Sequence, residues 1–263
     1  MDAKRAEVNG TAISYYDEGQ GDPIVLIHGF CGSKDYWQQV IPGLAEKHRL
    51  IAVDLPGHGG SGLPAGDISV ETMAEMIKGI FEELGLEKVS LIGHSLGGYV
   101  TLAFAEAYED RLKQFSLVHS TANPDSEEGK KGRGVAAGKI DAEGIKSFVD
   151  GLVPNLFASG EKHPEELQQA KEIGYGTNPE GAKAALKAMK RRPDRNHVLK
   201  NTKLPVLIVA GEKDQIVPPE KSFTVVGPNI MQVTIKGAGH MSMYEAPAEL
   251  VEVFADFWRS KQA

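Results

Sequence analysis

The chain has 263 residues, the length of one domain or of one domain that carries a large insertion. Hydrophobic residues make up 41% of the chain and charged residues 25%, which excludes a disordered protein. The formal net charge of −7 disfavours a nucleic-acid binder that works by neutralising phosphates. The single cysteine, Cys31, excludes a disulfide framework and a cysteine-rich zinc site.

The first residues of the chain contain no apolar run of the kind that a signal peptide carries, and the longest apolar stretches are far too short to span a bilayer. We therefore expect a cytoplasmic protein that contacts neither a membrane nor a nucleic acid. A monomer or a homodimer is expected.

Short apolar runs, typical of strands buried on both faces, recur along the chain. A hairpin comes first, because Asn9-Gly10 separates strand-like runs at 4–8 and 11–16. Helical patterns separate most of the later runs, and this alternation predicts an α/β fold with a mostly parallel, doubly wound sheet of about eight strands. The later strands are expected at 24–27, 50–53, 89–92, 115–118, 204–210 and 231–235.

Four helices are expected between and after these runs. Serine is a preferred N-cap residue, so Ser33 and Ser69 predict helices at 33–47 and 69–84. Gly85 is expected to end the second helix. Two more are expected at 95–108 and 246–260.

The alternation stops between about residues 122 and 200, where the sequence is charged and helical in pattern. Apolar residues at helical spacing predict a helix around 145–156, which Pro154 must kink or end, and Asn178-Pro179 predicts the start of another helix. We therefore predict an all-helical insertion, 122–200, within a core domain formed by 1–121 and 201–263.

The most informative segment is Gly93-His94-Ser95-Leu96-Gly97, a G-x-S-x-G motif that follows a strand-like run and precedes a helix-like one. A serine on such a tight turn has a strained backbone, and its neighbours at −2 and +2 must be small. It also stands at a helix N-terminus, which favours developing negative charge. This context predicts that Ser95 is a nucleophile.

Serine needs a base and an orienting acid to become nucleophilic. His240 lies in a Gly-rich loop after the last strand-like run, so its side chain can reach the edge of the sheet where Ser95 projects. Asp214 follows the preceding strand-like run and is the expected acid, with Glu212 and Asp125 as rivals.

The other histidines are weaker candidates for the base. His28, His58 and His94 lie inside turn motifs, where structural hydrogen bonds are the expected role. His119 ends a strand-like run and is placed to face the cleft.

An oxyanion hole needs two backbone N–H donors. The N–H group of Leu96, directly after the nucleophile, and that of Phe30, in the turn after the third strand, are the expected donors. We expect the Phe30 side chain to project into the cleft and Cys31 to be a packing residue, because no base is paired with this thiol.

These motifs resemble those of the α/β-hydrolase fold, and they occur in the family's chain order of Ser, Asp and His. The resemblance covers nearly the whole chain and implies that the helical insertion is a cap that covers the active site. The matching segments are His28-Gly29-Phe30, Asp54-Leu55-Pro56-Gly57-His58-Gly59, Gly93-His94-Ser95-Leu96-Gly97-Gly98, Gly211-Glu212-Lys213-Asp214 and Gly237-Ala238-Gly239-His240.

The resemblance also narrows the reaction. Epoxide hydrolases and haloalkane dehalogenases of this family have aspartate at the nucleophile position, so Ser95 argues against both and favours a carboxylesterase acting on a small-molecule ester without a metal or cofactor. Some cap residues are expected to line the pocket and the rest to pack within the cap. The candidates are Phe148, Leu152, Leu156, Phe157, Leu186 and Met189.

Two alternatives remain open at this point. The first is carbon–carbon bond hydrolysis or elimination on an anionic substrate, suggested by basic residues within the insertion. The second is a ligand receptor, since some members of this fold family are receptors that retain the three residues. The basic residues are Lys130, Lys131, Arg133, Lys190, Arg191, Arg192 and Arg195.

Overall fold

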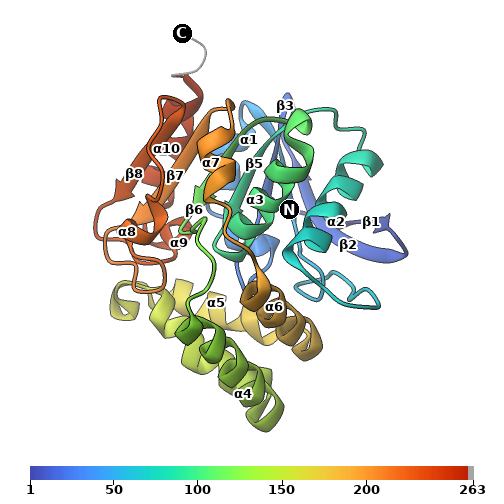
Figure 1. Ribbon diagram of the computed structural model, residues 1–263, viewed down its shortest axis with the longest axis vertical. Helices are drawn as coiled ribbons and strands as arrows, with labels where there is room; N and C mark the ends of the chain where they lie inside the picture. Colours follow the sequence, from blue (N-terminus) through green and yellow to red (C-terminus); the bar gives the residue numbers. More distant parts are fainter. Residues whose placement is uncertain (260–263) are drawn as a thin grey trace.

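The computed structural model describes residues 1–259 and contains an eight-stranded sheet with the order β1-β2-β4-β3-β5-β6-β7-β8 (Figure 1). β2 pairs antiparallel with both β1 and β4, and all other neighbours are parallel. The predicted α/β class and strand number are therefore confirmed. The strands are β1 (Lys4–Val8), β2 (Thr11–Glu18), β3 (Asp22–Ile27), β4 (His48–Val53), β5 (Val89–His94), β6 (Leu112–Val118), β7 (Val206–Gly211) and β8 (Ile230–Ile235).

The hairpin between β1 and β2 turns at Asn9 and Gly10, as predicted. Both residues have positive φ, 50° and 74°, which is the conformation that a two-residue hairpin turn requires. The hairpin forms one edge of the sheet, and β8 forms the other edge (Figure 1).

Helices cover both faces of the sheet. α2 (Val70–Glu83) and α3 (Leu96–Tyr108) pack against each other on one face, and α1 (Ile41–Ala45) and α10 (Pro247–Arg259) contact each other on the opposite face (Figure 1). Ser69 caps α2 through a reciprocal pair of hydrogen bonds with Thr72, and Gly85 ends it with φ 64°, as predicted. The predicted last residue of α10, Ser260, lies outside the described residues.

The helix predicted at 33–47 is two short pieces, a 3-10 turn η1 (Lys34–Trp37) and α1. Ser33 does cap the first piece, because its hydroxyl accepts the Asp35 N–H. Pro42 explains the interruption: it lacks an N–H group and disfavours a helical conformation in the residue before it, so the helix restarts there.

The insertion between β6 and β7 is helical, as predicted. Its main helix, α4, contains a non-helical residue at Gly144 (φ 82°, ψ 166°) and gives way to a 3-10 turn that contains Pro154. Asn178 caps α6 through its side-chain oxygen. The elements are α4 (Glu127–Leu152), η3 (Val153–Leu156), η4 (Gly160–Lys162), α5 (Pro164–Tyr175), α6 (Pro179–Arg191) and α7 (Asn196–Asn201).

α4, α5 and α6 lie together beyond one end of the sheet, whereas α7 returns to its side (Figure 1). The 4-residue helices α8 (Pro219–Ser222) and α9 (Ser242–Glu245) follow β7 and β8. The exact core and cap boundaries stay a prediction. Within residues 1–259, no helix combines the length and the apolar character that crossing a membrane demands.

Candidate active site

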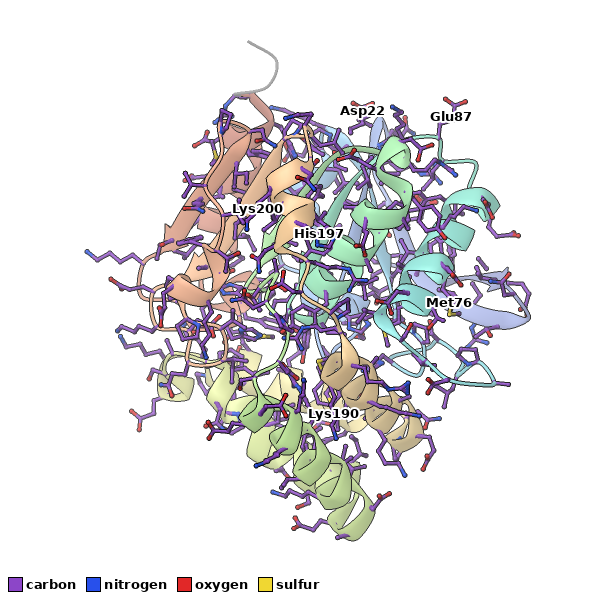
Figure 2. The ribbon with its side chains drawn as sticks, viewed as in Figure 1. Asp22, Met76, Glu87, Lys190, His197 and Lys200 are labelled. Atoms are coloured by element: carbon purple, nitrogen blue, oxygen red, sulfur yellow. The ribbon has the colours of Figure 1, made fainter. Side chains whose placement is uncertain are left out.

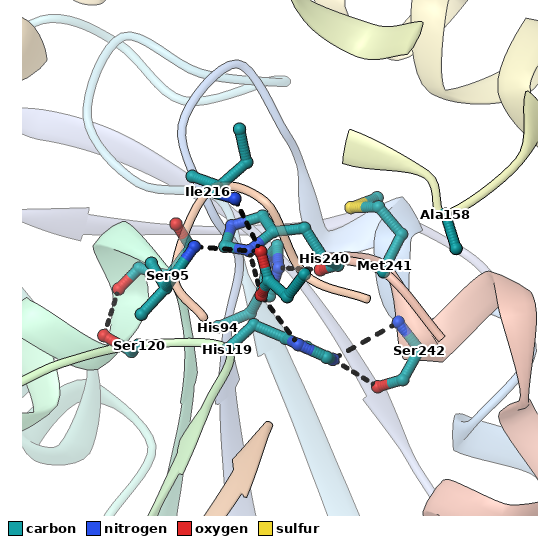
Figure 3. A network of polar contacts seen from close by, with 12 residues as sticks. His94, Ser95, His119, Ser120, Ala158, Ile216, His240, Met241 and Ser242 are labelled. Carbon is teal, nitrogen blue, oxygen red and sulfur yellow. Dashed lines mark hydrogen bonds and ion pairs between the residues drawn. The ribbon is translucent and has the colours of Figure 1, made fainter. Parts of the chain in front are cut away.

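Ser95 occupies a strained turn between β5 and α3. Its backbone has φ 50° and ψ −112°, a combination that is costly for a residue with a Cβ atom. Hydrogen bonds hold the turn in place: the Ser95 N–H donates to the Val118 carbonyl at 2.9 Å, and the Ser120 hydroxyl donates to the Ser95 carbonyl at 2.8 Å (Figure 3). The side chain is only partly buried, which leaves its hydroxyl reachable.

The glycines around Ser95 are required by close backbone contacts. A Cβ atom on Gly93 would lie 2.2 Å from the Gly97 carbonyl oxygen, and one on Gly97 would lie 2.4 Å from the Ile27 carbonyl oxygen. Gly98 is equally confined, because its Cβ would lie 2.3 Å from the Ser120 hydroxyl. The G-x-S-x-G spacing is therefore a packing requirement of the turn.

Gly97→Ala is expected to lower the free energy of unfolding by about 3 kcal/mol, because the new methyl group meets backbone that cannot move aside. Gly134→Ala is the matched control: Gly134 also lies within a helix, and no atom would approach its Cβ within 4 Å. That control should stabilise by about 0.5–1 kcal/mol. Urea unfolding measures both, and similar effects of the two substitutions would contradict this account of the motif.

His240 and Asp214 form a buried pair beside Ser95. Nδ1 of His240 lies 2.7 Å from Oδ2 of Asp214, and both side chains are almost fully buried (Figure 3). Asp214 follows β7, and His240 lies in the loop after β8, as expected from the sequence. Ser95 and His240 line the same cavity, so the structure brings the three predicted residues to one site.

The two rival acids lie elsewhere. Glu212 is exposed and accepts the Gly237 N–H at 2.9 Å. Asp125 accepts hydrogen bonds from Arg133 and Arg192. Neither forms a hydrogen bond or ion pair with His240, so the geometry favours Asp214.

Asp214 is held by four donors. Oδ1 accepts the backbone N–H groups of Ile216 and Val217 at 2.8 and 2.9 Å, and Oδ2 lies 3.2 Å from Nδ1 of His119 in addition to its bond with His240. Burial acts to raise the pKa of this carboxyl, but the two imidazoles lower it far below its usual value. Asp214 is therefore an acceptor only, and Nδ1 of each histidine carries the proton.

His119 lies beside Asp214, a contact that the sequence does not predict, although its place at the end of a strand-like run favours a position facing the cleft. The side chain is fully buried, and its Nε2 lies 2.7 Å from the Ser242 hydroxyl (Figure 3). Ser242 lies on α9, directly after the His240 loop, so His119 links Asp214 to that loop.

Other contacts fix the His240 loop. Nε2 of His94 donates to the His240 carbonyl at 2.9 Å, and the Glu245 carboxylate accepts the N–H groups of Gly239 and Ala158 at 2.8 and 2.7 Å. His94 thus has the structural role predicted for it. The same holds for His28 and His58, whose Nδ1 atoms lie 2.7 and 3.0 Å from the backbone carbonyl oxygens of Gly29 and Pro56.

The turn that carries Phe30 lies against the nucleophile. A Cβ on Gly29 would come within 3.2 Å of the Ser95 Cβ, and Leu96 is the first residue of α3. The Phe30 ring lines the cavity, as predicted, and contacts Phe148 of the insertion with ring centroids 6.0 Å apart. The positions of Phe30 and Leu96 beside Ser95 agree with the expectation that their backbone N–H groups form the oxyanion hole.

Cys31 is fully buried, and burial raises the pKa of its thiol. A thiol held in its protonated form is a poor nucleophile. This environment agrees with the packing role predicted for Cys31.

The cavity at Ser95 is small, about 60 Å³. Of the six apolar insertion residues considered from the sequence, Leu152, Leu156 and Met189 line it. Arg133, one of the basic residues considered from the sequence, lines it as well. Sequence reasoning did not identify three further lining residues, because they come from separate elements and belong to no motif. The three are Tyr36, Tyr99 and Ile216.

Most basic residues of the insertion are paired away from the cavity. Arg191 contacts Asp67 at 2.5 Å, Arg195 contacts Glu71 at 2.5 Å and Glu106 at 3.0 Å, and Lys190 is exposed on α6 (Figure 2). The basic residues that suggested an anionic substrate therefore do not form one cationic surface. Arg133 alone of these residues lines the cavity.

Within residues 1–259, His119, Asp214 and His240 form the one group of three side chains whose donor atoms could share a metal ion, since these atoms lie within 4.8 Å of one another. The Nδ1 atoms of both histidines already contact Asp214. A metal would have to replace these hydrogen bonds.

Four buried histidines make stability depend on pH. Burial lowers the pKa of His28, His58, His94 and His119, that of His58 to about 3. In the unfolded chain they bind protons near pH 6.5, so as pH falls the unfolded state takes up protons that the folded state excludes. The free energy of unfolding should therefore be greatest above pH 7. Below that, each histidine lowers it by about 1.4 kcal/mol per pH unit, in the range between its pKa in the unfolded chain and its lower pKa in the folded protein. Urea unfolding at pH 7, 6 and 5 measures this loss, and a constant free energy would contradict it.

Comparisons with known proteins agree with the fold. A model of the alpha/beta hydrolase fold family matches residues 22–138. The dihydrolipoyllysine-residue acetyltransferase component of the acetoin cleaving system from Pseudomonas putida is 31% identical over 97% of this chain and 69% of its own length. The same component from Cupriavidus necator is 27% identical, and this chain spans 64% of its length.

Solved structures are similar over nearly the whole chain. A thermophilic esterase from Thermogutta terrifontis superimposes with a TM-score of 0.92 at 31% identity, covering 99% of both chains. An enol-lactonase from Burkholderia xenovorans shares the fold with a TM-score of 0.90 at 24% identity, covering 97% of this chain and 100% of its own. The chain belongs to the alpha/beta hydrolase fold family, and the hydrolase class is supported by fold and relatives.

Proposed function

We propose that this protein is a serine hydrolase that cleaves carboxylic esters of small substrates through an acyl-enzyme. The observation that carries the proposal is the buried His240–Asp214 pair, which opens onto the same cavity as Ser95 on its strained turn. The similarity to an esterase at 31% identity supports ester cleavage as the reaction.

In this proposal, His240 accepts the Ser95 proton through Nε2 while the serine oxygen attacks the ester carbonyl. Asp214 keeps the His240 proton on Nδ1, which leaves Nε2 as the acceptor, and stabilises the imidazolium that forms. The alcohol then leaves with the proton from His240. A water molecule activated by the same histidine releases the acid and restores Ser95.

The backbone N–H groups of Phe30 and Leu96 stabilise the oxyanion in both tetrahedral intermediates. One such donor is worth about 10²–10³ in turnover. The dipole of α3, whose first residue is Leu96, adds to this stabilisation, because a helix N-terminus favours negative charge.

The size of the cavity favours small acyl groups. Its volume of about 60 Å³ is well below the roughly 300–1,000 Å³ typical of pockets for drug-sized ligands. Leu152, Leu156 and Met189 close it from the side of the insertion, so a long acyl chain has to displace cap residues. A small-molecule ester is therefore the proposed partner of the site.

We expect kcat/KM for p-nitrophenyl esters to be highest for acetate or butyrate and about tenfold lower for octanoate, since the longer chain must open the cap. Stopped-flow measurement with Ser95→Ala as the control tests the proposal. Equal turnover by that variant would contradict it. A single-turnover burst without further reaction would instead favour the receptor alternative.

Carbon–carbon bond cleavage of an anionic substrate is the second candidate, and Arg133 on the cavity wall is the observation that favours it. It would use the same serine and histidine. Reaction of Ser95 with a phosphonate, combined with no turnover of any small ester, would favour this candidate over ester hydrolysis.

A further inference from the structure

We propose that Arg133 is a substrate-binding residue that takes a carboxylate group of the substrate. The preferred esters are then monoanions, with the carboxylate at a distance from the ester bond. This inference rests on the proposed ester hydrolysis and specifies the substrate class of the same site.

Arg133 is positioned to contact a molecule bound at Ser95. It lies on α4, in the insertion, and lines the cavity together with Ser95 and His240. Its side chain is 28% exposed, so a ligand can reach it. Of the described residues that line this cavity, it is the only one among Lys, Arg, Asp and Glu.

The guanidinium of Arg133 has N–H donors that remain available to a ligand. Its Nε donates to Oδ2 of Asp125 at 3.0 Å, which orients the planar group. Within residues 1–259, no residue accepts a hydrogen bond from its two terminal nitrogens, each of which carries two N–H groups. Such a fork matches the two oxygens of a carboxylate.

The charges around Arg133 do not balance. Asp125 is shared with Arg192, whose terminal nitrogen lies 2.7 Å from Oδ1 of Asp125. Arg192 is buried and lies over the ring of Tyr99, 3.9 Å from its centroid, and Tyr99 lines the cavity. Two guanidinium groups therefore face one carboxylate, and the cluster retains one positive charge beside the cavity.

The charge state of Asp125 supports this count. Although burial acts to raise the pKa of Asp125, the two arginines lower it below its usual value, so this carboxyl is ionised at neutral pH. The catalytic acid proposed for the site, Asp214, is already bound by His119 and His240. An anionic group on the substrate is the remaining partner for the unbalanced charge.

A purely structural role for Arg133 predicts something different. If its ion pair with Asp125 only holds α4 in place, its removal changes stability and affects all substrates alike. A carboxylate-binding role predicts an effect on KM that depends on the charge of the substrate.

Two esters of the same shape separate these roles. Monoethyl succinate carries a carboxylate where ethyl 4-methylpentanoate carries an isopropyl group. Hydrolysis of each is followed by pH-stat titration in the wild type, in Arg133→Met, in Arg133→Lys, and in the control Arg191→Met, whose arginine is exposed and paired with Asp67.

We expect the wild type to prefer the monoanion by about tenfold or more in kcat/KM. Arg133→Met should raise KM for the monoanion by about 10- to 100-fold, the range for a hydrogen bond to a charged group, and should leave KM for the neutral ester within about twofold. Arg133→Lys should recover part of the loss, and Arg191→Met should change neither KM.

Hydrolysis of the neutral ester without a preference for the monoanion, or equal effects of Arg133→Met on both esters, would overturn the role of Arg133 and leave the proposed function intact. Failure to hydrolyse either ester, together with no reaction of Ser95 with a phosphonate, would overturn the proposed function itself and this inference with it.

Discussion

Ser95→Ala is expected to lower kcat for small p-nitrophenyl esters by about 10⁴- to 10⁶-fold, the range seen when the nucleophile of a serine hydrolase is removed. KM should change little, because the cavity wall loses only a hydroxyl group. The fold should persist, since the hydrogen bonds that hold the turn come from the backbone of residue 95 and from Ser120. Steady-state kinetics at saturating substrate measures the effect.

Ser147→Ala serves as the control for that experiment. Ser147 is a serine of α4 whose hydroxyl donates to Glu143 at 2.7 Å, and it does not line the cavity. Activity of Ser95→Ala above about a tenth of the parent would mean that another group attacks the ester, and the proposed mechanism would be wrong.

Asp214→Asn is expected to lower kcat by about 10⁴-fold while the protein still folds. The ionised carboxylate accepts hydrogen bonds from the Nδ1–H groups of both His119 and His240, and the NH₂ group of an amide cannot accept a hydrogen bond. Nδ1 of His240 then turns into an acceptor, its proton moves to Nε2, and the imidazole can no longer take the proton of Ser95.

Glu212→Gln is the matched control, because Glu212 precedes Asp214 by two residues but is exposed and bonded to the Gly237 N–H. We expect its kcat within about twofold of the parent. Both variants are first shown to be folded by circular dichroism. A larger loss of kcat in Glu212→Gln than in Asp214→Asn would mean that Asp214 is not the acid that orients His240.

The sheet could be predicted well from the sequence for a physical reason. Strands of a parallel sheet are buried on both faces, so they appear as continuous apolar runs bounded by turn residues. β3 to β8 all overlap the predicted runs. The prediction of one helix at 33–47 was wrong in extent. The segment has a helical pattern, but Pro42 interrupts the helix and leaves two short pieces.

The central residues of the site were predictable because each is tied to a local pattern. Ser95 lies in a turn that demands small neighbours, and Asp214 and His240 follow strands whose ends meet at one edge of the sheet. Their chemistry is therefore encoded within short segments, and the topology brings the segments together.

Arg133 and His119 could not be assigned in the same way. Arg133 belongs to the segment Lys130-Lys-Gly-Arg133, which is indistinguishable from a solvated helix face, and only the placement of α4 brings it to the cavity. Its companion Arg192 shares Asp125 from 67 residues away. His119 meets Asp214 across 95 residues. Such contacts depend on tertiary packing, which no local pattern specifies.

The most direct test of the central claim, that Ser95 is the nucleophile activated by His240 and Asp214, is to treat the protein with diisopropyl fluorophosphate and map the adduct by peptide mass spectrometry. The account predicts one phosphoryl group per chain, located on Ser95, with much slower labelling in Asp214→Asn. No adduct, or an adduct on another residue such as Cys31, would contradict it.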